Sequence, residues 1–252
     1  MSGYTTSFGT LGSGILDGGP PSQQFSPDQV AGLKLWLKAD AITGLNDGDA
    51  VTTWEDSSGQ NNDATQSTVA KKPTYQTNEI NGKPCVRFDG FDDCLQTPAF
   101  SVGPLTAFVV LKLTTLRIIY EQSANANEAP GFWLYGSTHS TLFVHKPAGG
   151  TARDRPGGLP TGAWQIVTQR CDGTHAGHKL WINGDEQSLT DNLSSNPGTA
   201  EISDVLNIGA RNNGAAFASA VDIAELLIYD AAVSDSDRQL IENYLNNKYA
   251  IF

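Results

Sequence analysis

Apolar and polar residues alternate over much of the chain, and this period of two restricts the fold more than any other feature. The hexapeptide LKLWLK at 33–38 alternates leucine with lysine and tryptophan, as a strand does. The run AFVVLKL at 107–113 is almost continuously apolar, which is typical of a strand buried on both faces. The same reasoning predicts further strands over residues 141–146, 163–170, 178–184, 205–210 and 222–230.

Turn-forming peptides separate these runs, including SSGQNND, NGK, DGF, PAGG, RPGG, NGD and NNG. Glycine is abundant, with 26 residues, and charged residues make up only 17% of the chain, a composition that suits short strands joined by many turns. We expect the peptide GGTARDRPGG at 149–158 to be a loop carrying Arg153 and Arg155. The pattern predicts an all-β sandwich rather than repeated β-α-β units.

One helix is predicted at the end of the chain. Ser234 can cap its first turn, and the acidic residues Asp235 and Asp237 complement the helix dipole there. Apolar residues then recur at helical spacing, at Leu240, Ile241, Tyr244 and Leu245. We therefore expect an amphipathic helix over residues 235–251 that packs against the sandwich.

Residues 1–26 differ from the rest, because glycine and serine dominate them and apolar residues occur singly. Such a segment cannot bury enough apolar surface to fold alone. Its isolated apolar side chains suit an extended arm that docks on a partner surface. These docking candidates are Tyr4, Phe8, Leu11 and Ile15. The predicted organisation is an extended N-terminal docking arm over 1–26 and one β-sandwich domain over 27–252.

The order of motifs resembles the concanavalin A-like lectin/glucanase superfamily, in its laminin-G-like branch. The matching pieces are LKLWLKAD, WEDSSGQNNDATQ, KPTYQTNEINGKPCVRFDGFDDCLQ, WQIVTQRCDGTHAGHKLWINGDE and DIAELLIYDAAVSDSDRQLIENYLNNKYAI. The resemblance covers residues 28–252 and implies a β-sandwich of jelly-roll type. Domains of this kind with a short polar N-terminal arm resemble virion proteins of tailed bacteriophages. Because the superfamily includes lectins, enzymes and structural proteins, the resemblance predicts the fold more closely than the function.

The peptide FDGFDD places Asp89, Asp92 and Asp93 within six residues. We interpret it as a turn between two strands, because Asp-Gly supplies a residue that tolerates positive φ and aspartates bond nearby backbone N–H groups. A calcium site is the alternative, since the resemblance implies that such sites occur in laminin-G-like domains. The spacing differs from a helix-loop-helix calcium loop. We therefore predict no metal here.

Catalytic patterns are missing from the sequence. Glucanases of the superfamily carry Glu-x-Asp-x-x-Glu on one strand, and no Glu-x-Asp occurs here. Glu225 lies in a strand without an acidic partner two residues away, so we expect a structural role for it. His175 and His178 lie at a hairpin tip without an evident third metal ligand. We predict a protein that is not an enzyme and needs no cofactor.

Carbohydrate binding is the better prospect, because sugars stack their apolar faces on aromatic side chains. In FWLYG at 132–136, Trp133 and Tyr135 share one face if Phe132 and Leu134 face the core. The further candidates for glycan binding are Trp54 and Trp181. The alternative is that these aromatic residues fill the sandwich or lie under the helix.

The net charge and the apolar runs limit the classes of partner, and the cysteines indicate the compartment in which the protein is made. The net charge of −11 opposes binding to nucleic acid. No run approaches the roughly 20 apolar residues of a membrane helix, and the N-terminus lacks the basic and apolar regions of a signal peptide. The odd set of Cys85, Cys94 and Cys171 favours reduced thiols made in a cytosol, with a Cys85–Cys94 bridge as the alternative.

Together these features predict a non-enzymatic structural or binding module. The preferred context is a bacteriophage virion, as a capsid decoration, fibre or tail-associated protein made in the host cytoplasm. Its arm would bind other virion proteins, it would be present in many copies, and its surface would bind cell-surface glycans. The alternative is a free lectin at the cell surface or outside the cell, and a glycoside hydrolase is the least expected class.

Overall fold

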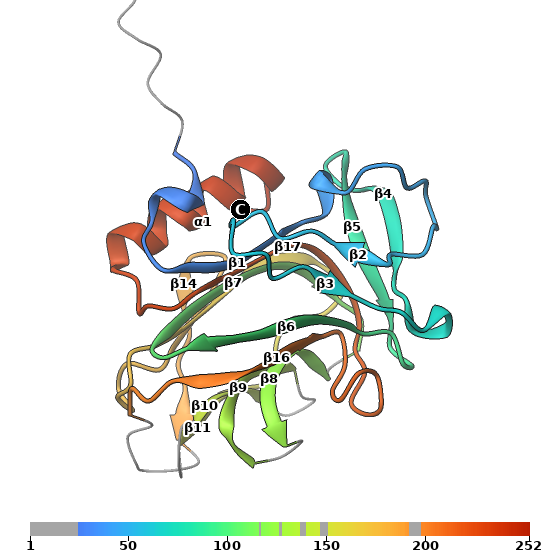
Figure 1. The fold of residues 1–252 in the computed structure, drawn as a ribbon. Coiled ribbons are helices and arrows are strands. Elements are labelled where there is room, and N and C mark those ends of the chain that lie inside the picture. The colour runs from blue at the N-terminus through green and yellow to red at the C-terminus, as the bar shows by residue number, and fades with distance from the viewer. Residues whose placement is uncertain (1–24, 116, 126–127, 137–139, 147–150, 192–197) are drawn as a thin grey trace, which may run out of the picture.

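The computed structural model describes residues 25–115, 117–125, 128–136, 140–146, 151–191 and 198–252. Residues 1–24, and with them Tyr4, Phe8, Leu11 and Ile15, lie outside the described part. The fold is a β-sandwich of two antiparallel sheets with an α-helix at the C-terminal end (Figure 1). The all-β sandwich expected from the sequence is therefore confirmed.

The first sheet, called here the helix-side sheet, has the order β14-β13-β12-β7-β17-β5-β4, with β1 paired to β17. Its strands are β1 (Leu33–Lys38), β4 (Thr74–Ile80), β5 (Lys83–Asp89), β7 (Leu105–Leu113), β12 (Trp164–Cys171), β13 (Lys179–Ile182), β14 (Asp185–Glu186) and β17 (Ala220–Tyr229). The apolar run in β7 is buried along nearly its whole length, as its composition predicts. It is covered by the second sheet on one face and by the helix on the other.

The second sheet has the order β15-β11-β10-β9-β8-β16-β6-β3-β2. Its strands are β2 (Thr53–Trp54), β3 (Ala64–Thr65), β6 (Leu95–Val102), β8 (Ile118–Asn125), β9 (Glu128–Gly136), β10 (Ser140–Lys146), β11 (Thr151–Pro156), β15 (Thr190–Asp191) and β16 (Ile202–Ile208). The prediction of a loop over residues 149–158 is wrong for the middle of this segment, because residues 151–156 form a strand that pairs with β10. The hydrogen bonds of strand pairing thus outweigh the turn preference of the glycines that flank this segment.

The main core lies between the two sheets. Its period-two character is clear in β9, where Phe132 and Leu134 are fully buried and contribute to this core. Trp133 and Tyr135 point to the other side of the same strand, as the alternation predicts.

Helix α1 (Asp235–Tyr249) packs on the outer face of the helix-side sheet (Figure 1). The Ser234 side chain accepts a hydrogen bond from the Asp237 backbone N–H, so the predicted cap is confirmed. Ile241 and Leu245 pack in a second apolar cluster with residues of β1, β7, β12 and β17. The helix stops two residues before the predicted end, because Ala250 adopts a left-handed conformation with φ 50°.

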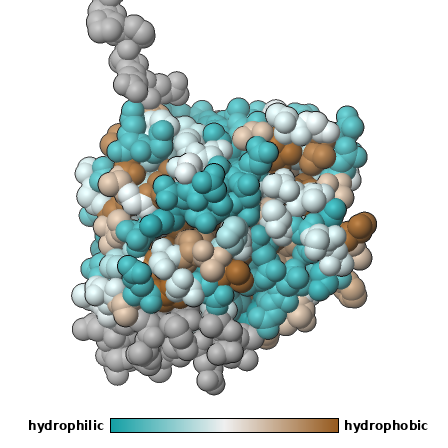
Figure 2. Space-filling view, in the orientation of Figure 1, coloured by the Kyte–Doolittle hydropathy of each residue, from teal (hydrophilic) through white to brown (hydrophobic). Residues whose placement is uncertain are grey.

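Three 3-10 turns complete the elements, η1 (Pro27–Gln29), η2 (Ala39–Ala41) and η3 (Val69–Lys71). Figure 2 shows a surface on which hydrophilic residues predominate and hydrophobic residues form small separate patches. Within the described residues, no helix is long and apolar enough to cross a membrane.

Candidate functional site

The outer face of the second sheet lies on the side of the sandwich away from α1 (Figure 1). Strand register places one residue from each of five strands in a single line across this face. This cross-strand row consists of Thr65, Gln96, Asn207, Glu121 and Trp133, on β3, β6, β16, β8 and β9. Directly paired residues of antiparallel strands point to the same side, so the row is a contiguous line of polar side chains that ends in an aromatic residue. Asn207, Glu121 and Trp133 are buried, and Thr65 and Gln96 are the accessible members.

Three aromatic residues meet at the tryptophan end of the row, and we call them the aromatic corner: Trp133, Tyr135 and Phe217. The rings of Tyr135 and Phe217 are perpendicular, with centroids 6.1 Å apart. Trp133 packs with Ile118 against Tyr135 and is only 6% exposed, whereas Phe217 is 42% exposed. The surface open to a ligand is therefore formed by Phe217 and Tyr135, with Trp133 as support beneath them.

A buried ion pair lies behind the aromatic corner. The Arg211 Nε is 2.6 Å from Glu121 Oε2, and both side chains are nearly inaccessible to solvent. Glu121 Oε1 also accepts a hydrogen bond of 2.8 Å from the Ser123 hydroxyl. The Arg211 guanidinium lies 4.8 Å from the centroid of the Phe217 ring, at cation–π distance. Arg211, held in place by Glu121, thus lies against one face of the Phe217 ring.

The backbone at Phe217 is unusual, with φ 52° in the left-handed region that bulky residues avoid. The preceding turn explains how it is held. Asn212, Asn213 and Gly214 also have positive φ, and the Arg211 backbone N–H donates to the Ala216 carbonyl. The Phe217 carbonyl accepts a hydrogen bond from Ile118 N–H of β8.

This loop also packs tightly against the hairpin that joins β5 to β6. A Cβ on Gly214 would lie 2.1 Å from the Asp92 carbonyl oxygen, so this position excludes any side chain. The exposed aromatic ring is thus presented by a loop with a defined conformation.

The other two tryptophans proposed from the sequence lie in buried places. Trp54 is fully buried in the core between the sheets. Trp181 is 2% exposed, and Arg238 of α1 lies 4.4 Å from its ring centroid. Neither ring has a face accessible to a sugar, so we do not include Trp54 or Trp181 in the candidate site.

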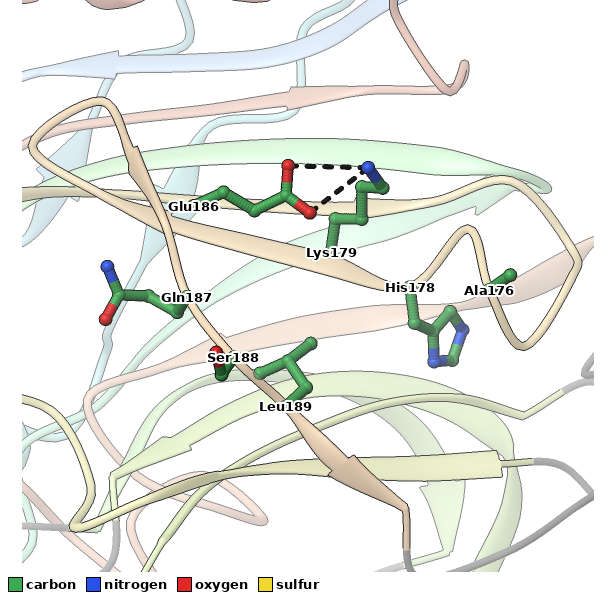
Figure 3. Close-up of a pocket in the computed structure, with 7 residues that line it drawn as sticks. All are labelled: Ala176, His178, Lys179, Glu186, Gln187, Ser188 and Leu189. Carbon is green, nitrogen blue, oxygen red and sulfur yellow. Dashed lines mark hydrogen bonds and ion pairs between the residues drawn. The ribbon is translucent and has the colours of Figure 1, made fainter.

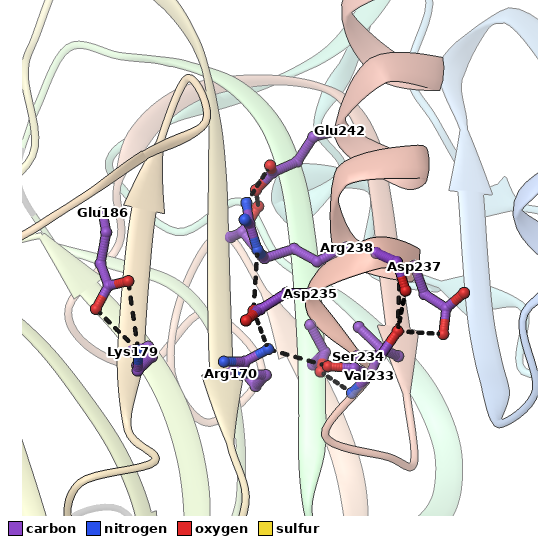
Figure 4. A network of polar contacts seen from close by, with 12 residues as sticks. Arg170, Lys179, Glu186, Val233, Ser234, Asp235, Asp237, Arg238 and Glu242 are labelled. Atoms are coloured by element: carbon purple, nitrogen blue, oxygen red, sulfur yellow. Dashed lines mark hydrogen bonds and ion pairs between the residues drawn. The ribbon is translucent and has the colours of Figure 1, made fainter.

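Arg170 and Arg238 both lie over the Trp181 ring. Figure 4 shows the acidic residues with which they pair. Arg170 bonds Asp235 at 2.7 Å, and Arg238 pairs with Glu242. Glu242 in turn accepts a hydrogen bond from the Thr168 hydroxyl of β12. The alternative stated for this tryptophan, that it lies under the helix, is what the structure shows.

The three aspartates form a turn, as predicted. Asp89 Oδ1 accepts from Phe91 N–H at 2.7 Å, and Asp93 Oδ2 accepts from Asp89 N–H at 2.9 Å. Gly90 has φ 83°, and a Cβ there would meet the backbone nitrogen of Ala220 at 2.8 Å. Two of the carboxylates therefore support the turn itself.

The same carboxylates also approach one another. Ligand atoms of Asp89, Asp92 and Asp93 all lie within 4.8 Å of each other, and these are the residues that could hold a cation. Burial raises the pKa of Asp93 to about 6, against the opposing effect of the hydrogen bond from Asp89 N–H. The turn explains this geometry, and the absence of a bound metal stays a prediction.

Glu225 is fully buried and has three donors. Its carboxylate accepts from Trp36 Nε1 at 2.6 Å, Tyr249 OH at 2.8 Å and Lys248 Nζ at 2.7 Å. These bonds join β17 to β1 and to the end of α1. The structural role expected for this residue agrees with its position.

A separate hollow of about 410 Å³ lies at the β13–β14 hairpin (Figure 3). Lys179 and Glu186 point toward each other there, with their charged groups 3.1 Å apart, and His178 lies at one end. Tryptophan, tyrosine and phenylalanine are missing from the described residues that line it. This hollow offers little surface for stacking, and its charges are already paired.

Cys85, Cys94 and Cys171 are buried free thiols in the structure. The predicted reduced state is therefore the state described, and the Cys85–Cys94 bridge is not formed. Burial raises the pKa of all three thiols, that of Cys94 to about 11, so they are poor nucleophiles.

Sequence reasoning found Trp133 and Tyr135 but missed Phe217, Arg211 and Glu121. The sequence RNNGAAF contains a turn signal just before Phe217, and this was the available clue. This turn signal does not show that the residues after the turn lie against strand β8.

Neither a family model nor a curated protein sequence matches this chain. Similar solved structures exist. Domain 4 of the extracellular GH43 arabinanase AbnA from Geobacillus stearothermophilus, in complex with arabinotriose, matches with a TM-score of 0.57 and 19% identity. The match covers 83% of this chain and 98% of that domain.

Two further similarities involve longer proteins. Trypanosoma rangeli sialidase matches with a TM-score of 0.58 and 13% identity over 93% of this chain and 36% of that one. The botulinum neurotoxin serotype D binding domain matches with a TM-score of 0.55 and 13% identity over 87% of this chain and 51% of that one. This chain thus spans about a third to a half of these two proteins. At such low identity the similarities establish the fold alone, which is a β-sandwich.

Proposed function

We propose that this domain is a carbohydrate-binding module and that it binds through the aromatic corner on the outer face of the second sheet. The observation that carries the proposal is Phe217. An exposed aromatic ring is held in a conformation unfavourable for its residue type, perpendicular to Tyr135 and backed by Arg211. Backbone strain of this kind persists where the surrounding structure imposes it, and it clusters at ligand sites.

The chemistry of the corner suits a sugar. The apolar face of a sugar ring stacks on an aromatic ring, and hydroxyl groups bond to neighbouring polar side chains. Arg117 is exposed beside the corner, with Nη1 3.4 Å from the Tyr135 hydroxyl, and it can donate to such groups. The presence of arabinotriose in the similar arabinanase domain is consistent with this function.

The proposed module binds without catalysis. Glycoside hydrolysis needs two carboxyl groups on either side of the sugar bond. In the aromatic corner the nearby acid, Glu121, is buried and paired with Arg211, and Glu225 is buried on the helix-side sheet. These positions support a binding role for the domain.

We further propose, from the sequence, that residues 1–26 attach the domain to a larger assembly and that the preferred assembly is a phage virion. The composition of the arm and its spaced apolar residues support this idea. Multiple copies would compensate for a weak single site, for which we expect dissociation constants of roughly millimolar size.

A glycan array tests the proposed binding. The parent protein should bind a subset of the glycans, and Phe217→Ala should lose that binding at least tenfold. Phe252→Ala is the matched control, because Phe252 is also exposed (53%) but lies beside Gly184 of the β13–β14 hairpin. Equal binding by the parent and Phe217→Ala would remove the aromatic corner from the site.

A further inference from the structure

The cross-strand row leads from the aromatic corner to a polar hollow. This amide hollow has a volume of about 540 Å³ and is lined by residues of β3, β6, β16 and adjoining loops. The side chains that matter here are Thr65, Gln66, Gln96 and Asn213. Thr65 and Gln96 are members of the row itself, so the hollow and the aromatic corner lie on one face of the second sheet.

Hydrogen bonds fix the amide side chains of the hollow. Asn207 Oδ1 accepts from Gln96 Nε2 at 2.9 Å and from Asn213 N–H at 3.0 Å. Gln66 Nε2 donates to Asn213 Oδ1 at 2.7 Å and to the Cys94 carbonyl at 2.8 Å. Two of these bonds involve backbone groups, whose roles as donor or acceptor are fixed. They therefore determine which end of each linked side-chain amide is the oxygen.

Two of the amides that line the hollow each keep one polar atom unused. Among the described residues, no hydrogen bond uses Gln96 Oε1 or Asn213 Nδ2, and buried Asn207 holds both residues in place from behind. Side-chain amides that are oriented by one hydrogen bond and open at the other end are suited to hydroxyl groups, which both donate and accept. A polyhydroxylated ligand fits this arrangement.

The hollow is nearly free of charge. Asp63 is the ionisable residue among the described residues that line it, and its Oδ1 accepts from Asp56 N–H at 2.8 Å. The protein as a whole carries a net charge of −11. An anionic ligand would gain no cationic partner in the hollow and would be repelled by the protein.

The distance between the two features exceeds one sugar ring. Three strand spacings separate β9 from β6, or about 14 Å at roughly 4.8 Å per strand. A ligand that reaches both Tyr135 on β9 and Gln96 on β6 must therefore have several units. Its direction would be across the strands and over the loop that carries Arg211 and Asn213, because Asn207 and Glu121 in the middle of the row are buried beneath that loop.

We propose that the amide hollow is a second sugar subsite and that the ligand is a neutral linear oligosaccharide lying across the strands from the aromatic corner to the hollow. The inference rests on the proposed function and adds the charge, the minimum length and the direction of the ligand. Binding to the aromatic corner alone would require only one terminal sugar.

Chain-length ladders test the second subsite. The probes are arabinose, xylose and β-linked glucose oligosaccharides of one to six units, titrated into the full chain and followed by NMR of backbone and side-chain amides. The parent should bind the longest member of at least one ladder about tenfold more tightly than the shortest that binds. Long oligosaccharides should shift the side-chain amides of Gln96 and Asn213, and short ones should leave them unchanged.

Two variants separate the subsites. Gln96→Ala should reduce affinity for long oligosaccharides to that for short ones, and Gln96→Glu, which keeps the side-chain volume, should do the same. Gln76→Ala, on β4 of the helix-side sheet, should leave every affinity unchanged. Phe217→Ala should weaken binding at every chain length.

The outcomes distinguish the two proposals. If the parent binds short and long oligosaccharides equally and the Gln96 variants match it, the second subsite is wrong and the aromatic corner stands. If alginate or hyaluronan binds more tightly than every neutral ladder, the neutral ligand is wrong. If the parent binds neither the ladders nor the array glycans, both proposals fail.

Discussion

At the scale of single residues, Phe217 combines a structural cost with an exposed position. Its φ of 52° is unfavourable for a residue with a Cβ, by about 1–3 kcal/mol. The ring is 42% exposed, so the core gains little from it. A residue that is costly to the backbone and contributes little to the core is better explained by a ligand than by folding.

Replacing Phe217 with glycine should separate these two effects. Phe217→Gly removes the ring and relieves the backbone, so we expect its unfolding free energy to stay within about 1 kcal/mol of the parent. Phe217→Ala keeps a Cβ at positive φ and should be about 1 kcal/mol less stable than Phe217→Gly. Both variants should lose glycan binding. Urea denaturation gives the stabilities, and an alanine variant as stable as the glycine variant would contradict backbone strain.

Asp93 should make stability depend on pH. Its pKa of about 6 in the folded state lies above the unfolded value of 3.8, so the folded protein binds the proton more tightly. Stability should therefore fall as pH rises from about 4 to about 7, by about 2–3 kcal/mol for a shift of about 2 pKa units at about 1.4 kcal/mol each. Asp93→Asn should remove this fall and keep an acceptor for Asp89 N–H.

Asp92→Asn is the matched control and should retain the pH dependence. Thermal melts from pH 4 to pH 7 measure both variants. Added calcium should leave the parent melting temperature unchanged if the aspartates serve the turn alone. A clear rise that Asp92→Asn abolishes would instead establish a calcium site.

At the scale of elements, strand β17 changes its partner midway. Its first residues pair with β5 and its later residues with β1, while β7 lies on its other side. A bulge occurs between Ile223 and Glu225. Ile223 faces the main core, whereas Ala224 and Glu225 both contact the helix side. The bulge thus turns Glu225 toward α1, where Trp36 and Lys248 can reach it.

Breaking this contact should detach the end of the helix. Glu225→Ala should lower the unfolding free energy by about 3–5 kcal/mol, because the buried carboxylate and its three donors act together. Glu225→Gln keeps the volume and part of the bonding and should lose less. Hydrogen exchange should show faster opening of α1 in both variants. A Glu225→Ala variant with parental stability would show that packing alone holds α1.

At the scale of the whole molecule, the two outer faces of the sandwich differ in what covers them. The helix-side sheet is covered by α1, and its outer tryptophans Trp36 and Trp181 are buried there. The second sheet carries the cross-strand row and the aromatic corner. We therefore place the proposed ligand site on the second sheet, because α1 covers the outer face of the other sheet.

The proposed docking arm can be tested by deletion. Removing residues 1–24 should change the unfolding free energy of the domain by less than about 1 kcal/mol, since an arm of this composition adds little to a core. Glycan binding should persist in the truncated protein, and incorporation into the particle should be lost. Full incorporation without the arm would exclude it as the anchor. Unfolding on truncation would show that the arm is part of the domain.

The sequence by itself determined the local features. Alternation of period two is a property of the strand backbone, so it predicted β1, β7 and the opposite faces of β9, including the shared side of Trp133 and Tyr135. The cap at Ser234 and the glycine turn after Asp89 were predictable because they depend on neighbouring residues.

The tertiary structure decided which surface is accessible. Alternation gives the face of a strand, but it does not show whether another element covers that face, and so Trp54 and Trp181 could not be told apart from Tyr135. The site also joins residues distant in the sequence, since Arg211 and Glu121 are separated by 90 positions. Register across several strands brings them together beside Phe217. Those long-range pairings depend on the packing of the whole sandwich, which no local pattern specifies.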